Sequence, residues 1–158
     1  MNNKNVNFVK LLKEKKYSLI VSIIENEFNE EQKTAGILNL SGVSRMLSNK
    51  SNDSIKLAIE DFKNSCFKEK DKDKLFDPFK NLVNSSVMFF DNEFRDNGNE
   101  LSVSFFDEIF ELYNQNKKLF ETNLNLMWAF VKIIKRTSSL KDVIEYLRKI
   151  MNLNLDSD

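Results

Sequence analysis

The sequence predicts an all-α fold, and three observations support this. The 158 residues include only three glycines and one proline, whereas all-β folds need both residues in their turns. Apolar residues recur at intervals of three and four along most of the chain, which is the helical spacing. Serine, asparagine and aspartate, the usual helix caps, separate the apolar stretches. With 41% apolar residues, a chain of this length is expected to form one domain, 1–158.

Three helices are predicted in the N-terminal third. The first spans 5–15, and the second spans 18–28 after a short break. The polar residues 29–32 separate this pair from a third helix over 34–47. An interior glycine costs about 1 kcal/mol relative to alanine. We therefore expect Gly42 to be present because a neighbouring helix approaches closely there.

The fourth helix follows the cap-rich residues 48–53 and ends near Phe67. Its apolar stripe consists of Ile55, Ala58, Ile59, Phe62 and Cys66. Charges of alternating sign then fill 68–74, a pattern typical of a solvated linker or helix end.

The C-terminal half contains four further predicted helices. Asp77-Pro78 is a typical helix start, and it begins a helix that runs to about Phe90. The polar residues 91–99 are expected to form the longest and most flexible loop. The remaining helices are predicted over 100–116, 124–134 and 139–153, the last capped by Ser139.

These helices form four antiparallel pairs, an arrangement that resembles tetratricopeptide (TPR) repeats. That family has a small residue midway along its first helix and a small-then-large pair in its second. Gly42 resembles the small residue of the first helix. Ala58 and Phe62 resemble the small-then-large pair of the second helix, and Val143 with Leu147 takes the place of this pair near the C-terminus. The resemblance implies a short superhelix of about eight helices, in units 1–31, 32–74, 75–118 and 119–155. Sixteen residues separate Gly42 from Ala58, which is longer than the family's spacing, so an unrelated compact helical bundle stays open.

The composition argues against catalysis. The chain has no histidine, which removes the usual acid–base group and the commonest metal ligand. The single cysteine cannot build a thiolate metal site, and its place on an apolar stripe predicts a buried core thiol. The three glycines are too scattered for a phosphate-binding loop. We therefore expect no catalytic residues, no metal and no cofactor.

Charge and hydropathy restrict the partners and the location. The chain has 24 basic and 24 acidic residues, and both signs are mixed locally, which argues against duplex nucleic acid or an anionic membrane as the main partner. The N-terminus lacks the apolar core of a signal peptide, and no apolar run reaches the roughly eighteen residues of a membrane span. Together with the single cysteine, this predicts a cytoplasmic protein.

One constellation is a candidate binding surface. Trp128, Lys132, Lys135 and Arg136 are spaced by four, seven and eight residues, so they share one side of the 124–134 helix and its end. The TPR resemblance implies that first helices line a ligand groove, and it adds Asn39, Arg45 and Asn5 to this surface. An indole beside cations suits an acidic or C-terminal peptide. The alternative is a core tryptophan beside ordinary solvated cations.

The predicted function is a non-catalytic protein- or peptide-binding scaffold. Two alternatives stay open: the N-terminal repeat domain of a larger enzyme of the glycosyltransferase or sulfotransferase type, and a compact helical-bundle regulator or inhibitor. The sequence stops where a further repeat would begin, with no polar capping helix. An uncapped repeat exposes an apolar face, so this favours a longer protein or self-association through the C-terminal end.

Overall fold

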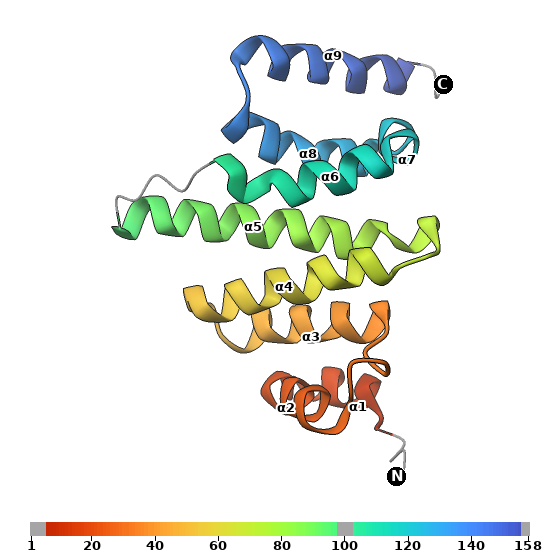
Figure 1. Cartoon of the computed structure of the whole chain (residues 1–158), viewed down its shortest axis with the longest axis vertical. Helices are drawn as coiled ribbons and strands as arrows, with labels where there is room; N and C mark the ends of the chain where they lie inside the picture. The colour runs from red at the N-terminus through yellow and green to blue at the C-terminus, as the bar shows by residue number, and fades with distance from the viewer. Residues whose placement is uncertain (1–5, 98–102, 156–158) are drawn as a thin grey trace.

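The computed structural model describes residues 6–97 and 103–155, and every regular element in these ranges is helical. The helices stack along the long axis of the molecule, with the two termini at opposite ends (Figure 1). The elements are α1 (Phe8–Lys13), α2 (Tyr17–Glu27), α3 (Ala35–Ser48), α4 (Asn52–Lys68), η1 (Lys72–Lys74), α5 (Phe76–Asn97), η2 (Val103–Phe106), α6 (Asp107–Gln115), α7 (Lys117–Thr122), α8 (Leu124–Thr137) and α9 (Leu140–Leu155). The all-α prediction is confirmed.

Side-chain caps begin several of these helices. The Thr34 hydroxyl accepts from the backbone N–H of Ile37 at the start of α3, and the Ser51 hydroxyl accepts from the N–H of Ser54 in α4. The predicted cap of α9 is confirmed, because the Ser139 hydroxyl accepts from the N–H of Asp142 at 3.3 Å. The Asp142 carboxylate in turn accepts from the N–H of Ser139 at 3.2 Å, which completes a reciprocal cap.

Gly42 of α3 leaves room for a side chain of α4. A Cβ atom built on Gly42 would lie 2.6 Å from Cε1 of Phe62, a contact that real Cβ atoms do not make. Phe62 is buried in α4, in the stripe that the sequence predicts. The expectation that Gly42 admits a neighbouring helix is confirmed, and the group that it admits is an aromatic ring.

The flexible loop predicted over 91–99 is wrong for residues 91–97, because α5 continues to Asn97. The polar side chains there bond to other helices. Asn52 of α4 donates to Glu93 at 2.8 Å, and Asn92 donates to Asn52 at 3.1 Å. These bonds hold the C-terminal turns of α5 against the start of α4, so the polar run marks a tertiary contact. Residues 98–102 lie outside the described part of the chain.

Two other boundaries differ from the prediction. The first helix is shorter than 5–15: α1 ends at Lys13, and Lys15 has φ of 55°, a left-handed conformation that a continuing helix excludes. Within the described residues 103–116, the helix predicted over 100–116 is a short 3₁₀ turn followed by α6. Asn116 then interrupts the helix, and α7 follows as an element that the sequence analysis does not predict.

The directions of the central helices follow from their contacts. The start of α4 meets the end of α5, so these helices are antiparallel. Lys132 of α8 bonds to Asn84 of α5, and Arg136 bonds to Asp91, so numbering increases in the same direction along both helices. Helices α5 and α8 are therefore parallel neighbours, and α9 packs back on α8.

The main core extends from α4 to α9 and is rich in aromatic rings. Phe79 of α5 meets Phe120 edge-on with ring centroids 4.3 Å apart, and Tyr113 of α6 stacks on Phe130 of α8 at 4.2 Å. Within the described ranges, no helix combines the length and the apolar character needed to cross a bilayer.

Candidate ligand-binding surface between α5 and α8

Helix α8 buries one side and exposes the other. Seven of its residues are buried, all apolar. Its exposed side carries Lys132 and Lys135, and the Trp128 side chain is 49% exposed. The alternative that places Trp128 in the core is therefore wrong. The predicted stripe of one indole and cations is a real surface feature of α8.

A hollow of about 450 Å³ lies between this side of α8 and the facing side of α5. It is lined by Asn84, Val87, Met88, Asp91, Lys132, Lys135 and Arg136. Arg136 donates to both carboxylate oxygens of Asp91, from Nε at 2.9 Å and from Nη2 at 2.6 Å. Lys132 donates to Oδ1 of Asn84 at 2.6 Å. These bonds fix the two cations against α5.

Lys135 differs from the other two cations of the hollow. Its side chain is exposed and makes no hydrogen bond or ion pair with the residues that the structure describes. The hollow thus has three cationic side chains and one carboxylate, Asp91, around the partly buried apolar side chains of Val87 and Met88. Such a surface attracts an anionic group and offers apolar contact beside it.

The other predicted surface residues lie elsewhere. Asn39 of α3 accepts a hydrogen bond from Asn81 of α5 at 3.1 Å, so it belongs to the α3–α5 junction. Asn5 lies outside the described residues. Of the predicted set, the structure brings Lys132, Lys135 and Arg136 together around the hollow, with residues of α5. Trp128 lies on α8 one turn before Lys132 and does not line the hollow.

Arg45 is held inside the fold. Its Nε donates to Asp61 of α4 at 2.8 Å, and its Nη2 donates to Glu25 of α2 at 2.7 Å. Burial would lower the pKa of Arg45, but hydrogen bonds and attraction from the two carboxylates raise it above its ordinary value. Both partners come from neighbouring helices, so Arg45 connects α2, α3 and α4 and is not placed on the α8 surface.

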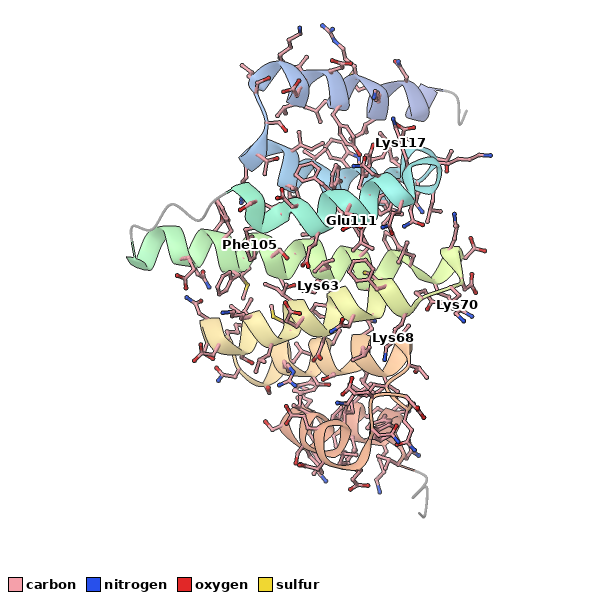
Figure 2. All side chains as sticks on the ribbon, in the orientation of Figure 1. Lys63, Lys68, Lys70, Phe105, Glu111 and Lys117 are labelled. Atoms are coloured by element: carbon pink, nitrogen blue, oxygen red, sulfur yellow. The ribbon has the colours of Figure 1, made fainter. Side chains whose placement is uncertain are left out.

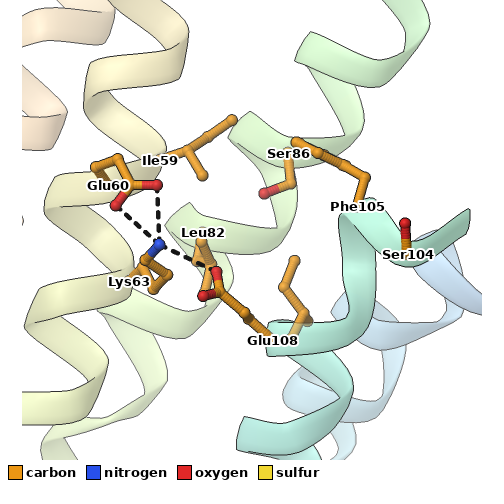
Figure 3. A pocket seen from close by; sticks show the side chains of 9 residues that line it. Ile59, Glu60, Lys63, Leu82, Ser86, Ser104, Phe105 and Glu108 are labelled. Carbon is orange, nitrogen blue, oxygen red and sulfur yellow. Dashed lines mark hydrogen bonds and ion pairs between the residues drawn. The ribbon is translucent and has the colours of Figure 1, made fainter. Parts of the chain in front are cut away.

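A second, smaller hollow of about 270 Å³ opens between α4, α5 and the η2–α6 segment (Figure 3). Lys63 lies at its edge, 2.8 Å from Glu60 and 3.0 Å from Glu108. Burial would lower the pKa of Lys63, but the two carboxylates raise it. Lys63 of α4 is the one cation among the described residues that line this hollow, and it is already paired with carboxylates of α4 and α6. We therefore interpret the hollow as a structural contact between α4 and α6.

The side of the stack that shows α4 and α6 in front carries charged side chains, among them Lys63, Lys68 and Glu111 (Figure 2). Lys68 donates to the backbone oxygens of Glu30 and Lys33 at 2.9 and 3.0 Å, which anchors the loop before α3. In the predicted linker, Lys74 pairs with Asp71 at 2.9 Å. These contacts stabilise the fold locally, and we assign them no role in binding.

Cys66 is a buried core thiol, as predicted, and burial raises its pKa to about 12. A thiol with so high a pKa is almost entirely protonated at neutral pH and is a poor nucleophile. Across residues 6–97 and 103–155, no group of three histidine, cysteine, aspartate or glutamate side chains could hold a metal ion.

The sequence alone does not indicate the α5 side of the hollow. Asn84 and Asp91 lie 48 and 45 residues before their α8 partners, and nothing in the local pattern indicates that they meet.

No protein-family model, curated protein or solved structure matches this chain.

Proposed function

We propose that this chain is a non-catalytic, TPR-like scaffold that binds an acidic peptide segment of another protein on the α5–α8 surface. The proposal rests mainly on the hollow between α5 and α8. There, the apolar side chains of Val87 and Met88 lie beside three cations, Lys132, Lys135 and Arg136. The unpaired ammonium of Lys135 is the first group available to a ligand carboxylate. Trp128, one helical turn before Lys132, supplies an exposed ring for an apolar side chain.

The fixed positions of two cations in the hollow support this proposal. Lys132 and Arg136 are held by α5, so a ligand meets two cations whose positions are largely set and loses less side-chain entropy on binding. The stack in Figure 1 is elongated, which favours a repeat array over a compact bundle. Parallel α5 and α8 flank the surface, as successive first helices would in the TPR-like arrangement.

Trp128 is the only tryptophan, and it lies on α8 one turn from Lys132, so its fluorescence reports on the surface beside the hollow. The first experiment probes an array of short peptides in which acidic, neutral and basic versions share the same aliphatic and aromatic residues. We expect the acidic versions to bind preferentially. Titration with the tightest binders should shift the Trp128 emission to the blue, and added salt should weaken binding because the charges are exposed.

The decisive variant is Lys135→Glu, because Lys135 has no partner in the described fold and its loss should leave stability unchanged. Lys149→Glu, which makes the same change at an exposed position of α9, is the matched control. We expect Lys135→Glu to weaken acidic-peptide binding roughly tenfold or more and the control to leave it nearly unchanged. Binding that ignores peptide charge, or that both variants weaken equally, would overturn the proposal.

A further inference from the structure

Helix α9 has a second apolar stripe, and the described residues leave most of it exposed. Its first stripe, Val143, Tyr146 and Ile150, is buried in the core against α6 and α8. The second, here named the α9 stripe, consists of Leu140, Ile144, Leu147 and Met151. Leu140 is 75%, Ile144 43% and Met151 63% exposed, and Leu147 is partly buried.

The exposure of this stripe contrasts with α5. Helix α5 also has apolar groups on two sides, and α4 covers one side while α8 covers the other. In α9, only one side has a neighbouring helix. The spacing of the α9 stripe is four, three and four residues, which is the seam of a helix that packs lengthwise against another helix.

We propose that the α9 stripe is a dimer interface, occupied by α9 of a second copy of the chain in antiparallel orientation. With the two-fold axis between Glu145 and Tyr146, Leu140 lies opposite Met151 of the second copy. Ile144 then lies opposite Leu147 of the second copy, and symmetry repeats both layers. The stripe therefore matches its own reverse in four consecutive apolar layers.

The charges beside the stripe agree with this register. Lys141, Glu145 and Arg148 lie along its open flank, with Glu145 between the two cations. In the antiparallel pair, Arg148 of the second copy lies about two residues, or roughly 3 Å along the axis, from Glu145. The carboxylate of each copy therefore comes within reach of the other copy's guanidinium.

The opposite end of the stack is a poorer match for the α9 stripe. The exposed apolar residues there, Val9 and Leu19, have Lys10, Lys13, Lys15 and Lys16 nearby in the sequence. Head-to-tail stacking would bring these lysines towards Lys141 and Arg148, and like charges oppose it. The tail-to-tail arrangement also closes after two copies. This inference is independent of the proposed function, because it uses another surface.

The first test measures molecular mass by sedimentation over a wide range of protein concentration. We expect a reversible monomer–dimer equilibrium, since an interface of one helix pair is small. Ile144→Glu should weaken the dimer roughly a hundredfold or more, because symmetry places the change in the interface twice. Leu57→Glu is the matched control, with the same kind of change at an α4 side chain that is 50% exposed. It should leave the dimer intact, and circular dichroism should show both variants folded.

The second test reports on the register. Ile144→Cys should cross-link to its counterpart with a short bismaleimide, because the two positions lie three residues apart across the axis. Lys149→Cys, on the far side of α9, should not cross-link, and the native Cys66 is buried and should not react. A chain that is monomeric at all concentrations overturns the proposal. So does a dimer that survives Ile144→Glu, or cross-linking through Lys149→Cys in place of Ile144→Cys.

Discussion

Substituting the two described glycines of α3 by alanine should change the free energy of unfolding in opposite directions. Alanine favours a helix over glycine by about 1 kcal/mol. At Gly36, no atom lies within 4 Å of the added Cβ, so Gly36→Ala should stabilise the protein by about 0.5–1 kcal/mol. At Gly42, the same methyl group would meet the Phe62 ring at 2.6–2.8 Å.

The cost at Gly42 follows from the rigidity of its surroundings. Phe62 is fully buried in α4, so its ring cannot turn into solvent to relieve the contact. Overpacking of this kind costs about 1–3 kcal/mol, which exceeds the gain in helix propensity. We expect Gly42→Ala to lower the free energy of unfolding by about 1 kcal/mol. The two variants should therefore differ by about 2 kcal/mol.

Urea unfolding followed by circular dichroism measures both variants, and a double-mutant cycle identifies the cause. In a Phe62→Leu background the ring is gone, so Gly42→Ala should become neutral or stabilising. If Gly42→Ala stabilises the wild-type chain as much as Gly36→Ala does, the close approach of α4 to Gly42 is wrong.

Two further predictions concern buried polar groups. Arg45→Met should lower the free energy of unfolding by about 2 kcal/mol, because Asp61 loses its ion pair in a partly buried position; a loss below about 0.5 kcal/mol in urea unfolding would contradict this. Cys66 should make the protein less stable in alkali: its pKa rises from 9.0 to about 12 on folding, so the unfolded chain loses this proton first as the pH increases. This loss of stability is small below pH 9, and between the two pKa values its slope approaches about 1.4 kcal/mol per pH unit. Cys66→Ala should remove that part of the decline between pH 9 and pH 11, and parallel curves for the two proteins would contradict the assignment.

Features that depend on local pattern could be predicted from the sequence. The stripe of α4 from Ile55 to Cys66 is buried as predicted, because helical spacing alone places those residues on one side. The Ser139 cap could be predicted for the same reason, since a cap and the first turn that it serves are neighbours in sequence.

Features that depend on distant contacts could not be predicted. Asp91, Asn92 and Glu93 have the composition of a loop, yet partners on α4 and α8 hold them in a helix. The candidate surface shows the same limit. Its α8 half follows from the spacing of Trp128 and the cations, whereas its α5 half depends on how two helices 27 residues apart in sequence come together.

The order of the stack has a consequence for folding. Most helices pack against the helix that precedes or follows them, and the direct contact of α5 with α8 is the main exception. Low sequence separation between contacting residues allows rapid folding, because little chain entropy is lost before each contact forms.

The two ends of the stack should also differ in their stability against local unfolding. Helix α1 has no buried residue and α2 buries only Ile20 and Ile24, so hydrogen exchange should open this end first while α4, α5 and α8 stay closed.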